Sequence, residues 1–257
     1  MDHIFLSDVH LGAFSDEQNQ TLESELISLI YYCLENQIQI HVLGDLFDYW
    51  MEYPTYLPKI GQPLLRAFKN YNHQFSPSTY ILGNHDNWTR GYFSKLGFEV
   101  KPDYHEITLD ENQLFLHHGD GLTQKEFQLQ RPLFHKMLRS NWFTNLYQFI
   151  LPAEAGIDLM KRFSEMSRES FDLRPEILNQ WSELFLKNFN FDVVIFGHDH
   201  IPRIETFSDG TYINPGAFFA HQTVIYYTNR AFNIVRWNSN ENQFIPFKYT
   251  FEKDTNL

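Results

Sequence analysis

The chain has 257 residues, of which 43% are hydrophobic, and a formal net charge of −12. This length fits one large domain, and the apolar content is enough for a sizeable core and argues against global disorder. The acidic balance excludes a general polyanion-binding surface, because nucleic-acid-binding proteins usually carry a basic face. The sequence has neither an apolar stretch near the ~20 residues of a membrane span nor a secretory signal, which predicts a cytoplasmic location.

Short apolar runs of strand length recur along the chain, and each ends in polar residues and glycine. These runs are 3–6, 38–43, 79–82, 113–116 and 192–196. Between the first two, Leu22, Leu26, Leu29 and Ile30 recur at helical spacing, which predicts a helix over Glu17–Glu35. Strands that alternate with helices indicate an α/β fold, in which ligands bind beyond the carboxyl ends of the strands.

From Arg203 onward the pattern changes to strands and turns. The apolar segments Thr223–Tyr227, Phe232–Trp237 and Phe244–Phe251 are each long enough for one strand. We expect these strands to form a second sheet that packs on the first.

One segment, Arg131–Ser170, differs from the rest of the chain. It looks helical, it holds Trp142, Phe143 and Tyr147 close together, and its six basic and four acidic residues give a balance of +2. The rest of the chain holds 14 basic and 28 acidic residues, a balance of −14. We expect a helical insertion at about residues 125–172 within a single domain over residues 1–257.

Five polar clusters close the strand-like runs. They are Asp8-Val9-His10, Gly44-Asp45-Leu46-Phe47-Asp48, Gly83-Asn84-His85-Asp86, His118-Gly119-Asp120 and Gly197-His198-Asp199-His200. Carboxylate, amide and imidazole groups together suit divalent metals. If the backbone stays extended, Asp8 with His10, and His198 with His200, share a face and can aim at one site. Any one cluster is usually a turn, but five in this order indicate a metal centre.

This order of motifs resembles the calcineurin-like metallophosphoesterases, whose pattern is D-x-H, GD, GNH(D/E), H and GHxH, over roughly residues 1–219. The resemblance implies a four-layer α/β sandwich of two mixed β-sheets flanked by helices. It also implies two divalent metal ions, with Mn²⁺ favoured and Fe or Zn suited to the same donors. The implied ligands are Asp8, His10, Asp45 and His200 for one ion, and Asp45, Asn84, His118 and His198 for the other.

The implied reaction is hydrolysis of a phosphoester or phosphoanhydride by a hydroxide that the two metal ions generate. In the family pattern His85 lies near the leaving group, as an acid or a charge stabiliser. Asp48 lies three residues after the bridging Asp45, and it is expected to orient His85 or a metal-bound imidazole. The alternative for Asp48 is an ordinary turn carboxylate.

Within the family, the chain resembles the UDP-2,3-diacylglucosamine hydrolases of lipid A biosynthesis. Leu43–Trp50 resembles their LGDLF-(acid)-x-W stretch, and the aromatic insertion resembles their hydrophobic lid with a basic, serine-bearing end. The resemblance implies hydrolysis of UDP-2,3-diacylglucosamine to 2,3-diacylglucosamine 1-phosphate (lipid X) and UMP. It also implies an amphiphilic substrate and peripheral contact with lipids of the cytoplasmic face of the inner membrane. The candidate substrate-binding residues are Asn84, Arg131, Trp142, Arg162, Ser167 and Arg168.

Two alternatives remain open at this level. The chain has His85 where those hydrolases usually have an arginine, which favours another calcineurin-like phosphodiesterase or phosphatase, with a nucleotide or protein substrate. A non-catalytic scaffold of the same fold is a more remote alternative. The insertion itself is either a lid or a helical hairpin that packs its aromatic residues into ordinary core. No nucleic-acid partner and no obligate protein partner are expected.

Overall fold

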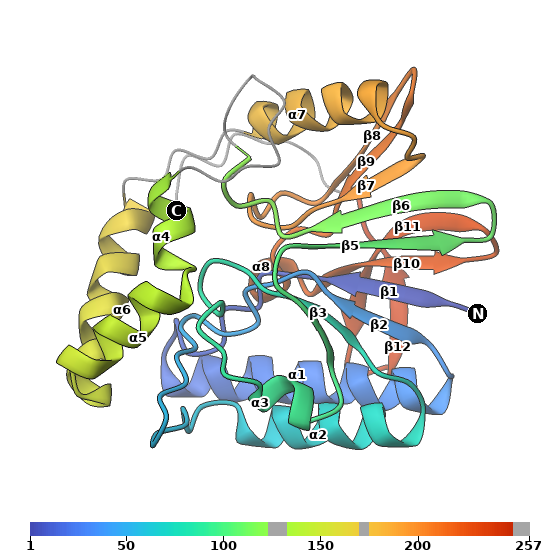
Figure 1. Cartoon of the computed structure of the whole chain (residues 1–257). Helices are drawn as coiled ribbons and strands as arrows, with labels where there is room; N and C mark the ends of the chain where they lie inside the picture. The colour runs from blue at the N-terminus through green and yellow to red at the C-terminus, as the bar shows by residue number, and fades with distance from the viewer. Residues whose placement is uncertain (123–132, 170–174, 249–257) are drawn as a thin grey trace.

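The computed structural model describes residues 1–122, 133–169 and 175–248. In these ranges the chain forms two mixed β-sheets with helices on their outer sides (Figure 1). The first sheet has the strand order β12-β11-β10-β1-β2-β3-β4. Its strands are β1 (His3–Leu6), β2 (Gln39–Val42), β3 (Thr79–Ile81), β4 (Glu99–Lys101), β10 (Thr223–Thr228), β11 (Ala231–Asn238) and β12 (Gln243–Pro246).

The second sheet has the order β5-β6-β7-β9-β8. Its strands are β5 (Tyr104–Leu109), β6 (Asn112–His117), β7 (Val193–Ile195), β8 (Arg203–Phe207) and β9 (Gly210–Asn214). Strands β1, β2, β3 and β4 pair in parallel, as do β6, β7 and β9, so that the carboxyl ends of β1, β2, β3, β6 and β7 lie at one end of the molecule (Figure 1).

Four layers follow from the alternation of side chains along the strands. On β1, Ile4 and Leu6 pack with α1 (Asp16–Glu35), α2 (Gln62–Gln74) and α3 (Tyr92–Lys95) on the outer side of the first sheet. Phe5 points the other way, into an apolar core shared by both sheets. On the far side of the second sheet, Trp181 and Phe185 of α7 (Pro175–Asn188) pack on Phe115 and Phe196. The order is therefore helices, sheet, sheet, helix.

The expectation for the C-terminal strands was wrong in one respect. Strands β10, β11 and β12 do not form the second sheet; they extend the first one, because β10 pairs antiparallel with β1, with His3 opposite Tyr227. The second sheet is built instead from β6 and β7, which had been expected in the first sheet, together with β5, β8 and β9. Residues 249–251 of the expected last strand lie outside the described residues.

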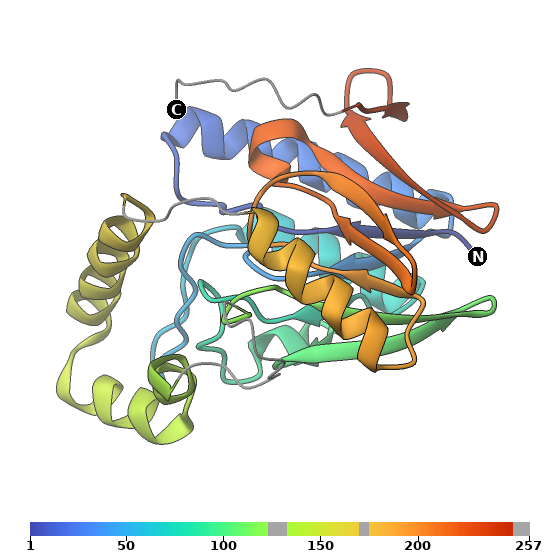
Figure 2. The same ribbon diagram turned by 90° about the horizontal axis from the view of Figure 1, so that it is seen from above.

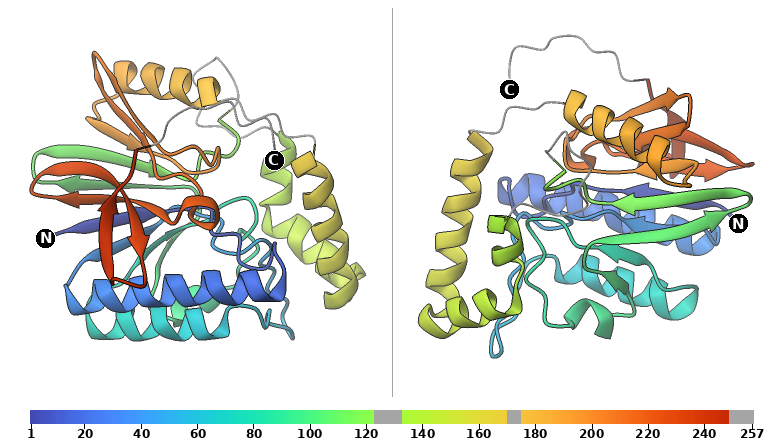
Figure 3. Two further views of the ribbon diagram at one scale, coloured as in Figure 1. Left: turned by 180° about the vertical axis from the view of Figure 1, so that it is seen from behind. Right: turned by 45° about the horizontal axis from the view of Figure 1, so that its top comes forward.

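Helices α4 (Leu133–Leu138), α5 (Asn141–Ile150) and α6 (Ala153–Glu169) lie beyond the carboxyl ends of the strands, and Figures 2 and 3 show them set apart from the two sheets. A short helix, α8 (Phe218–His221), lies between β9 and β10. Within the described ranges, none of the helices combines the length and the apolar character needed to cross a membrane.

Candidate metal centre

The five polar clusters converge at one end of the molecule, although they come from both sheets. Asp8, Asp45 and Asn84 follow β1, β2 and β3 of the first sheet, whereas His118 and His198 follow β6 and β7 of the second. Most of the side chains in the cluster are buried. The site therefore lies between the edges of two packed sheets. The apolar core that both sheets share lies next to it.

The backbone at these positions is left-handed rather than extended. Asp8, His10, Asp45, His198 and His200 have φ angles of 53°, 47°, 53°, 72° and 63°. The expected geometry, in which alternate side chains of an extended strand share a face, is therefore wrong, and local turns bring each pair together instead. This conformation costs non-glycine residues conformational energy, and it is found most often at functional sites.

Two glycines let neighbouring loops approach the donors closely. A Cβ at Gly83 would lie 2.0 Å from Oδ1 of Asp45, and a Cβ at Gly44 would lie 2.6 Å from Nδ1 of His118. Gly44 also has a positive φ of 94°. Any larger residue at either position would therefore displace a donor side chain.

Three groups of described residues each place three donor atoms within 4.8 Å of one another. The groups are Asp8 with His10 and His200, Asp45 with His118 and His198, and His10 with Asp48 and His85. The first group holds three of the residues that the family resemblance assigns to one metal ion, and the second holds three of those assigned to the other. The third places both Asp48 and His85 beside His10.

Asp45 lies at the centre of the cluster. Its Oδ2 is 3.2 Å from Nε2 of His118, 3.8 Å from Nε2 of His10 and 3.9 Å from Nε2 of His85. Asn84 joins through its Oδ1, which is 3.1 Å from Nε2 of His118. Asp45 thus faces donors of all three groups, as a shared ligand would.

Hydrogen bonds to backbone carbonyls fix two imidazole rings. Nδ1 of His118 donates to the carbonyl of Leu43 at 2.7 Å, and Nδ1 of His85 donates to the carbonyl of Asp48 at 2.5 Å. Because a carbonyl only accepts, Nδ1 carries the hydrogen in each ring and Nε2 is directed to the cluster. At Asp48 it is the carbonyl that makes this bond, while the carboxylate Oδ1 stands 3.8 Å from Nδ1 of both His10 and His85.

The carboxylates make the cluster favourable for positive charge. Burial alone would lower the pKa of His10, but Asp48, Asp8 and Asp45 outweigh burial and raise it to about 9. At His118, Asp45 likewise outweighs burial and raises the pKa to about 10. Burial would raise the pKa of Asp45, but the adjacent histidines hold it below its usual range. At His198, in contrast, burial and the charge of His118 lower the pKa to about 4. The carboxylates thus favour positive charge at His10 and His118, which is also the electrostatic condition for holding a cation there.

Orphaned polar atoms show that the residues fit a metal centre. Oδ1 of Asp8 and both ring nitrogens of His10 are buried and have no hydrogen-bond partner among the described residues. Such atoms are rare in proteins, because burying an unsatisfied polar group is costly. Lone pairs directed at a divalent ion would satisfy them, and carboxylate and imidazole are donors that such ions accept.

Further polar residues, which the sequence did not single out as functional, brace the loops of the site. The buried carboxylate of Asp86 accepts hydrogen bonds from the backbone of Leu46 and Gly83, and so links the loops after β2 and β3. Burial, together with the charge of Asp45, raises the pKa of Asp86 to about 6. Behind His198, Asp199 pairs with Arg203 at 2.5 Å. Each brace holds a loop that carries donor residues.

The helical segment α4–α6 is fastened to the site through Arg139, which follows α4. Its guanidinium donates to the carbonyls of Leu82, Gly83 and Pro102 and to Oδ2 of Asp120 at 2.9 Å. Leu82 and Gly83 precede Asn84, and Asp120 follows His118, so one side chain connects α4 to two of the loops that carry donor residues.

Helix α5 has two different faces. Phe143 and Tyr147 pack against Trp88, and together with Tyr53 they belong to one apolar cluster. The opposite face is exposed, with Trp142 69%, Leu146 42%, Phe149 87% and Ile150 64% accessible. One face of α5 is therefore packed against the loop that carries Trp88, and the other face is apolar and exposed.

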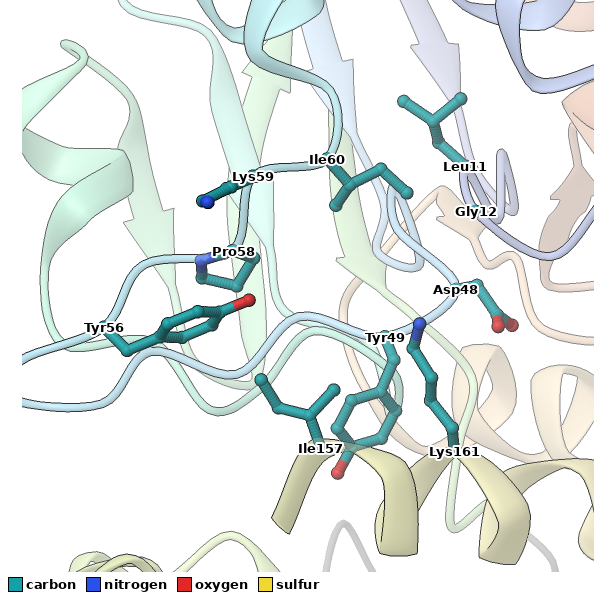
Figure 4. A pocket seen from close by; sticks show the side chains of 10 residues that line it. All are labelled: Leu11, Gly12, Asp48, Tyr49, Tyr56, Pro58, Lys59, Ile60, Ile157 and Lys161. Atoms are coloured by element: carbon teal, nitrogen blue, oxygen red, sulfur yellow. The ribbon is translucent and has the colours of Figure 1, made fainter. Parts of the chain in front are cut away.

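The candidate substrate contacts are only partly described. Arg131 lies outside the described residues, and Ser167 and Arg168 lie on α6 at positions whose side chains are not described. Arg162 is exposed on α6. Its neighbour Lys161, which the sequence analysis overlooked, lines a cavity beside Asp48 (Figure 4). The sequence gives no signal for Lys161, because it lies in a helix of mixed charge and the cavity is completed by a loop distant in sequence.

The two mixed sheets and the converging carboxylate–imidazole groups define a metal-dependent phosphoesterase fold with a candidate metal centre. The chain belongs to the calcineurin-like phosphoesterase family, whose family model matches residues 1–202. Among curated relatives, the UDP-2,3-diacylglucosamine hydrolase of Porphyromonas gingivalis is 28% identical over 218 residues, covering 77% of this chain and 82% of that protein. The Aeromonas hydrophila hydrolase of the same name is 27% identical over 215 residues, covering 80% and 85%. A solved phosphoesterase from E. coli, Yfce, is 16% identical with a TM-score of 0.49, covering 95% of this chain and 97% of its own.

Proposed function

We propose that the chain hydrolyses the diphosphate of UDP-2,3-diacylglucosamine to UMP and 2,3-diacylglucosamine 1-phosphate, a step of lipid A biosynthesis. The observation that carries the proposal is the juxtaposition of a buried carboxylate–imidazole cluster with a helix, α5, that exposes an apolar face. Such a pair suits a substrate with a phosphate at one end and acyl chains at the other. The names of the curated relatives support the same substrate.

We assign the donors to two divalent ions, with manganese as the proposed metal. Asp8, His10, Asp45 and His200 would hold one ion, and Asp45, Asn84, His118 and His198 the other. When bound, such ions neutralise phosphate oxygens and lower the pKa of an attacking water. Asp45 is the proposed shared ligand because its Oδ2 faces His10 and His118 together.

The remaining polar residues would orient the reacting phosphate. The bond from Nδ1 of His85 to the carbonyl of Asp48 fixes the ring so that Nε2 faces the cluster, where it can contact the phosphate. The carboxylate of Asp48 lies beside both His10 and His85 and would hold the two rings in a fixed orientation relative to each other. His118 is held in the same way by the carbonyl of Leu43.

The exposed face of α5 is the proposed lid surface, within a single domain whose insertion covers about residues 125–172. Trp142, Leu146, Phe149 and Ile150 lie on one side of the helix, at spacings of three, four and seven residues. Each such side chain would gain free energy by contact with acyl chains or with a lipid surface. We therefore propose peripheral contact with the cytoplasmic face of the inner membrane.

The direct test is incubation of the purified protein with Mn²⁺ and UDP-2,3-diacylglucosamine in detergent micelles, with nucleotide products separated by chromatography. UMP release that EDTA abolishes and Mn²⁺ restores is the expected result. Release of UDP would show cleavage of a different bond and contradict the proposal. Hydrolysis of a chromogenic phosphodiester without cleavage of the lipid substrate would instead indicate a general phosphodiesterase. His85 in place of arginine would then be the sequence difference that agrees with this result.

A further inference from the structure

A buried polar network lies behind the turn that carries His198 and His200. Asp199, between these two histidines, is 3% exposed. Its Oδ2 accepts a hydrogen bond from Nη2 of Arg203 at 2.5 Å, and its Oδ1 accepts from Nη1 of Arg203 at 3.0 Å and from the backbone amide of Ile201 at 3.1 Å. These bonds fix the side chain of Asp199, and with it the backbone between the two histidines.

Arg203 joins this turn to helix α7 and to the second sheet. It is the first residue of β8, it is buried, and its Nη1 also donates to the carbonyl of Ile201 at 2.8 Å. Its Nε donates to Oδ1 of Asn179 on α7 at 2.8 Å, and its Nη2 donates to the hydroxyl of Tyr212 on β9 at 3.1 Å. Arginine suits this position because its planar group presents several donors in a fixed fork. One buried guanidinium therefore connects α7, two strands and the turn.

Asn214, the last residue of β9, holds the beginning of the same turn. Its Nδ2 donates to the carbonyl of Gly197 at 2.9 Å and to Oδ1 of Asp199 at 2.8 Å. Gly197 and Asp199 flank His198, so Asn214 fixes the backbone on both sides of that candidate ligand. This support matters because His198 and His200 hold left-handed backbone conformations, which side chains other than glycine disfavour.

The turn also holds a candidate ligand from the other sheet. The backbone amide of His198 donates to Oδ2 of Asp8 at 2.9 Å. The other oxygen, Oδ1, is buried without a hydrogen-bond partner among the described residues and lies 3.4 Å from Nε2 of His200. The positions of Asp8, His198 and His200 therefore depend on one turn, and these three residues are assigned to both proposed ions.

We propose that Arg203 is a positioning residue for the metal centre. By fixing the turn through Asp199, it sets the spacing between ligands of the two ions and thereby the affinity for both. This role rests on the proposed assignment of Asp8, His198 and His200 as ligands. Since Asn179 accepts from Nε of Arg203, the position of α7 influences both ions by the same path. Residues that hold metal ligands in this way typically contribute roughly 10- to 100-fold to metal affinity.

The test measures the binding of Mn²⁺ to the EDTA-treated full chain by titration calorimetry, together with the melting temperature of the metal-free protein. Arg203→Met should weaken the binding of both ions by roughly 10- to 100-fold. It should also lower the melting temperature, because the buried carboxylate of Asp199 loses its partner. The matched control is Leu29→Ala on α1, which removes a fully buried side chain from the outer side of the first sheet. This control should lower the melting temperature and leave Mn²⁺ affinity unchanged.

A milder pair of variants keeps the test decisive even if Arg203→Met does not fold. Asn179→Ala removes only the partner of Nε, and it should weaken the binding of both ions by roughly 3- to 10-fold, the usual effect of one lost hydrogen bond. Asn179→Asp, whose carboxylate can still accept that hydrogen bond, should retain the affinity of the wild type.

Wild-type Mn²⁺ affinity in Arg203→Met and in Asn179→Ala, with only the melting temperature lowered, would show that the network is purely structural and would overturn the inference. An equal loss of affinity in Leu29→Ala and Arg203→Met would also overturn it, because the loss would then follow stability alone. Failure of the proposed function is distinct from both results. A wild-type protein that binds two Mn²⁺ ions but leaves UDP-2,3-diacylglucosamine intact would refute the proposed substrate and not the role of Arg203.

Discussion

The loops of the donor cluster and the helices α4–α6 differ in how they are held. The donor loops are buried, lie between two sheets and are braced from several sides, for example by Asp86 and by Asp199 with Arg203. Helix α5, in contrast, is fastened by one face only and exposes the other. From this difference we infer that the core fixes the geometry for the reaction, and we propose that the separately attached helices select the substrate.

The largest expected effect comes from the centre of the buried region. Asp45→Ala should lower turnover of every phosphoester substrate by several orders of magnitude, because Asp45 faces donors of all three groups. Metal content, measured by elemental analysis, should fall in the same variant, and it should not fall in Asp209→Ala, which changes an exposed carboxylate. Near-normal turnover with two bound metal ions would refute the role of Asp45.

The next effect separates catalysis from metal binding. His85→Ala should reduce kcat by roughly 10²–10⁴-fold, the usual contribution of a positioned imidazole, without loss of metal. The reason is that His85 is not one of the proposed ligands: its Nδ1 donates to the carbonyl of Asp48, and its Nε2 is left to contact the phosphate. A fall in metal stoichiometry would instead identify His85 as a ligand.

Arg139 joins the two regions, so removing it should affect both. Arg139→Met removes the charge that pairs with buried Asp120, a change that costs about 3–5 kcal/mol when a buried pair is broken. Urea unfolding should show the loss, and activity should fall on lipid and small substrates alike. Adding Asp120→Asn should recover part of the stability, and if the two changes are simply additive then the pair is not coupled.

The smallest effect comes from a buried histidine outside the donor cluster. His41 is buried on β2 between His3 and Thr79, and burial, with His3 and His105 nearby, lowers its pKa well below the ordinary value. Below pH 6.5 His41 is protonated in the unfolded chain but stays neutral in the folded one. The free energy of unfolding should therefore fall by up to about 1.4 kcal/mol for each unit by which the pH is lowered. In EDTA, His41→Gln should flatten this slope, and an unchanged slope would exclude His41 as its source.

The convergence of the candidate donor residues was predictable because the chemistry restricts both residue type and position. Asp8, Asp45, Asn84, His118 and His198 each follow a short apolar run, and strands of this fold end at one edge. The left-handed φ angles at Asp8 and His10 were not predictable, because neither residue type demands that conformation. The sequence therefore indicated which residues meet, but not the turns that bring them together.

Sheet membership and the faces of the insertion depend on contacts distant in sequence. Each apolar strand could pair with several others, and only the packing of Phe5 and Ile225 against Leu114 shows which side of each sheet is shared. Likewise the spacing of Trp142 and Phe143 places them on different sides of α5, but it does not say which one meets Trp88. The cavity at Lys161 was missed for the same reason.

One measurement tests directly whether the core performs the reaction while the exposed face of α5 selects a lipid substrate. The ratio of kcat/KM for UDP-2,3-diacylglucosamine to that for bis(p-nitrophenyl) phosphate is compared in wild type, in Trp142→Ser/Phe149→Ser and in Phe143→Ser. At ~25 cal/mol per Å² of buried apolar surface, the exposed-face variant should lose roughly tenfold or more in this ratio at unchanged melting temperature. Phe143→Ser, which removes an anchoring side chain, should instead lower the melting temperature and both activities. An unchanged ratio in the exposed-face variant would contradict the account.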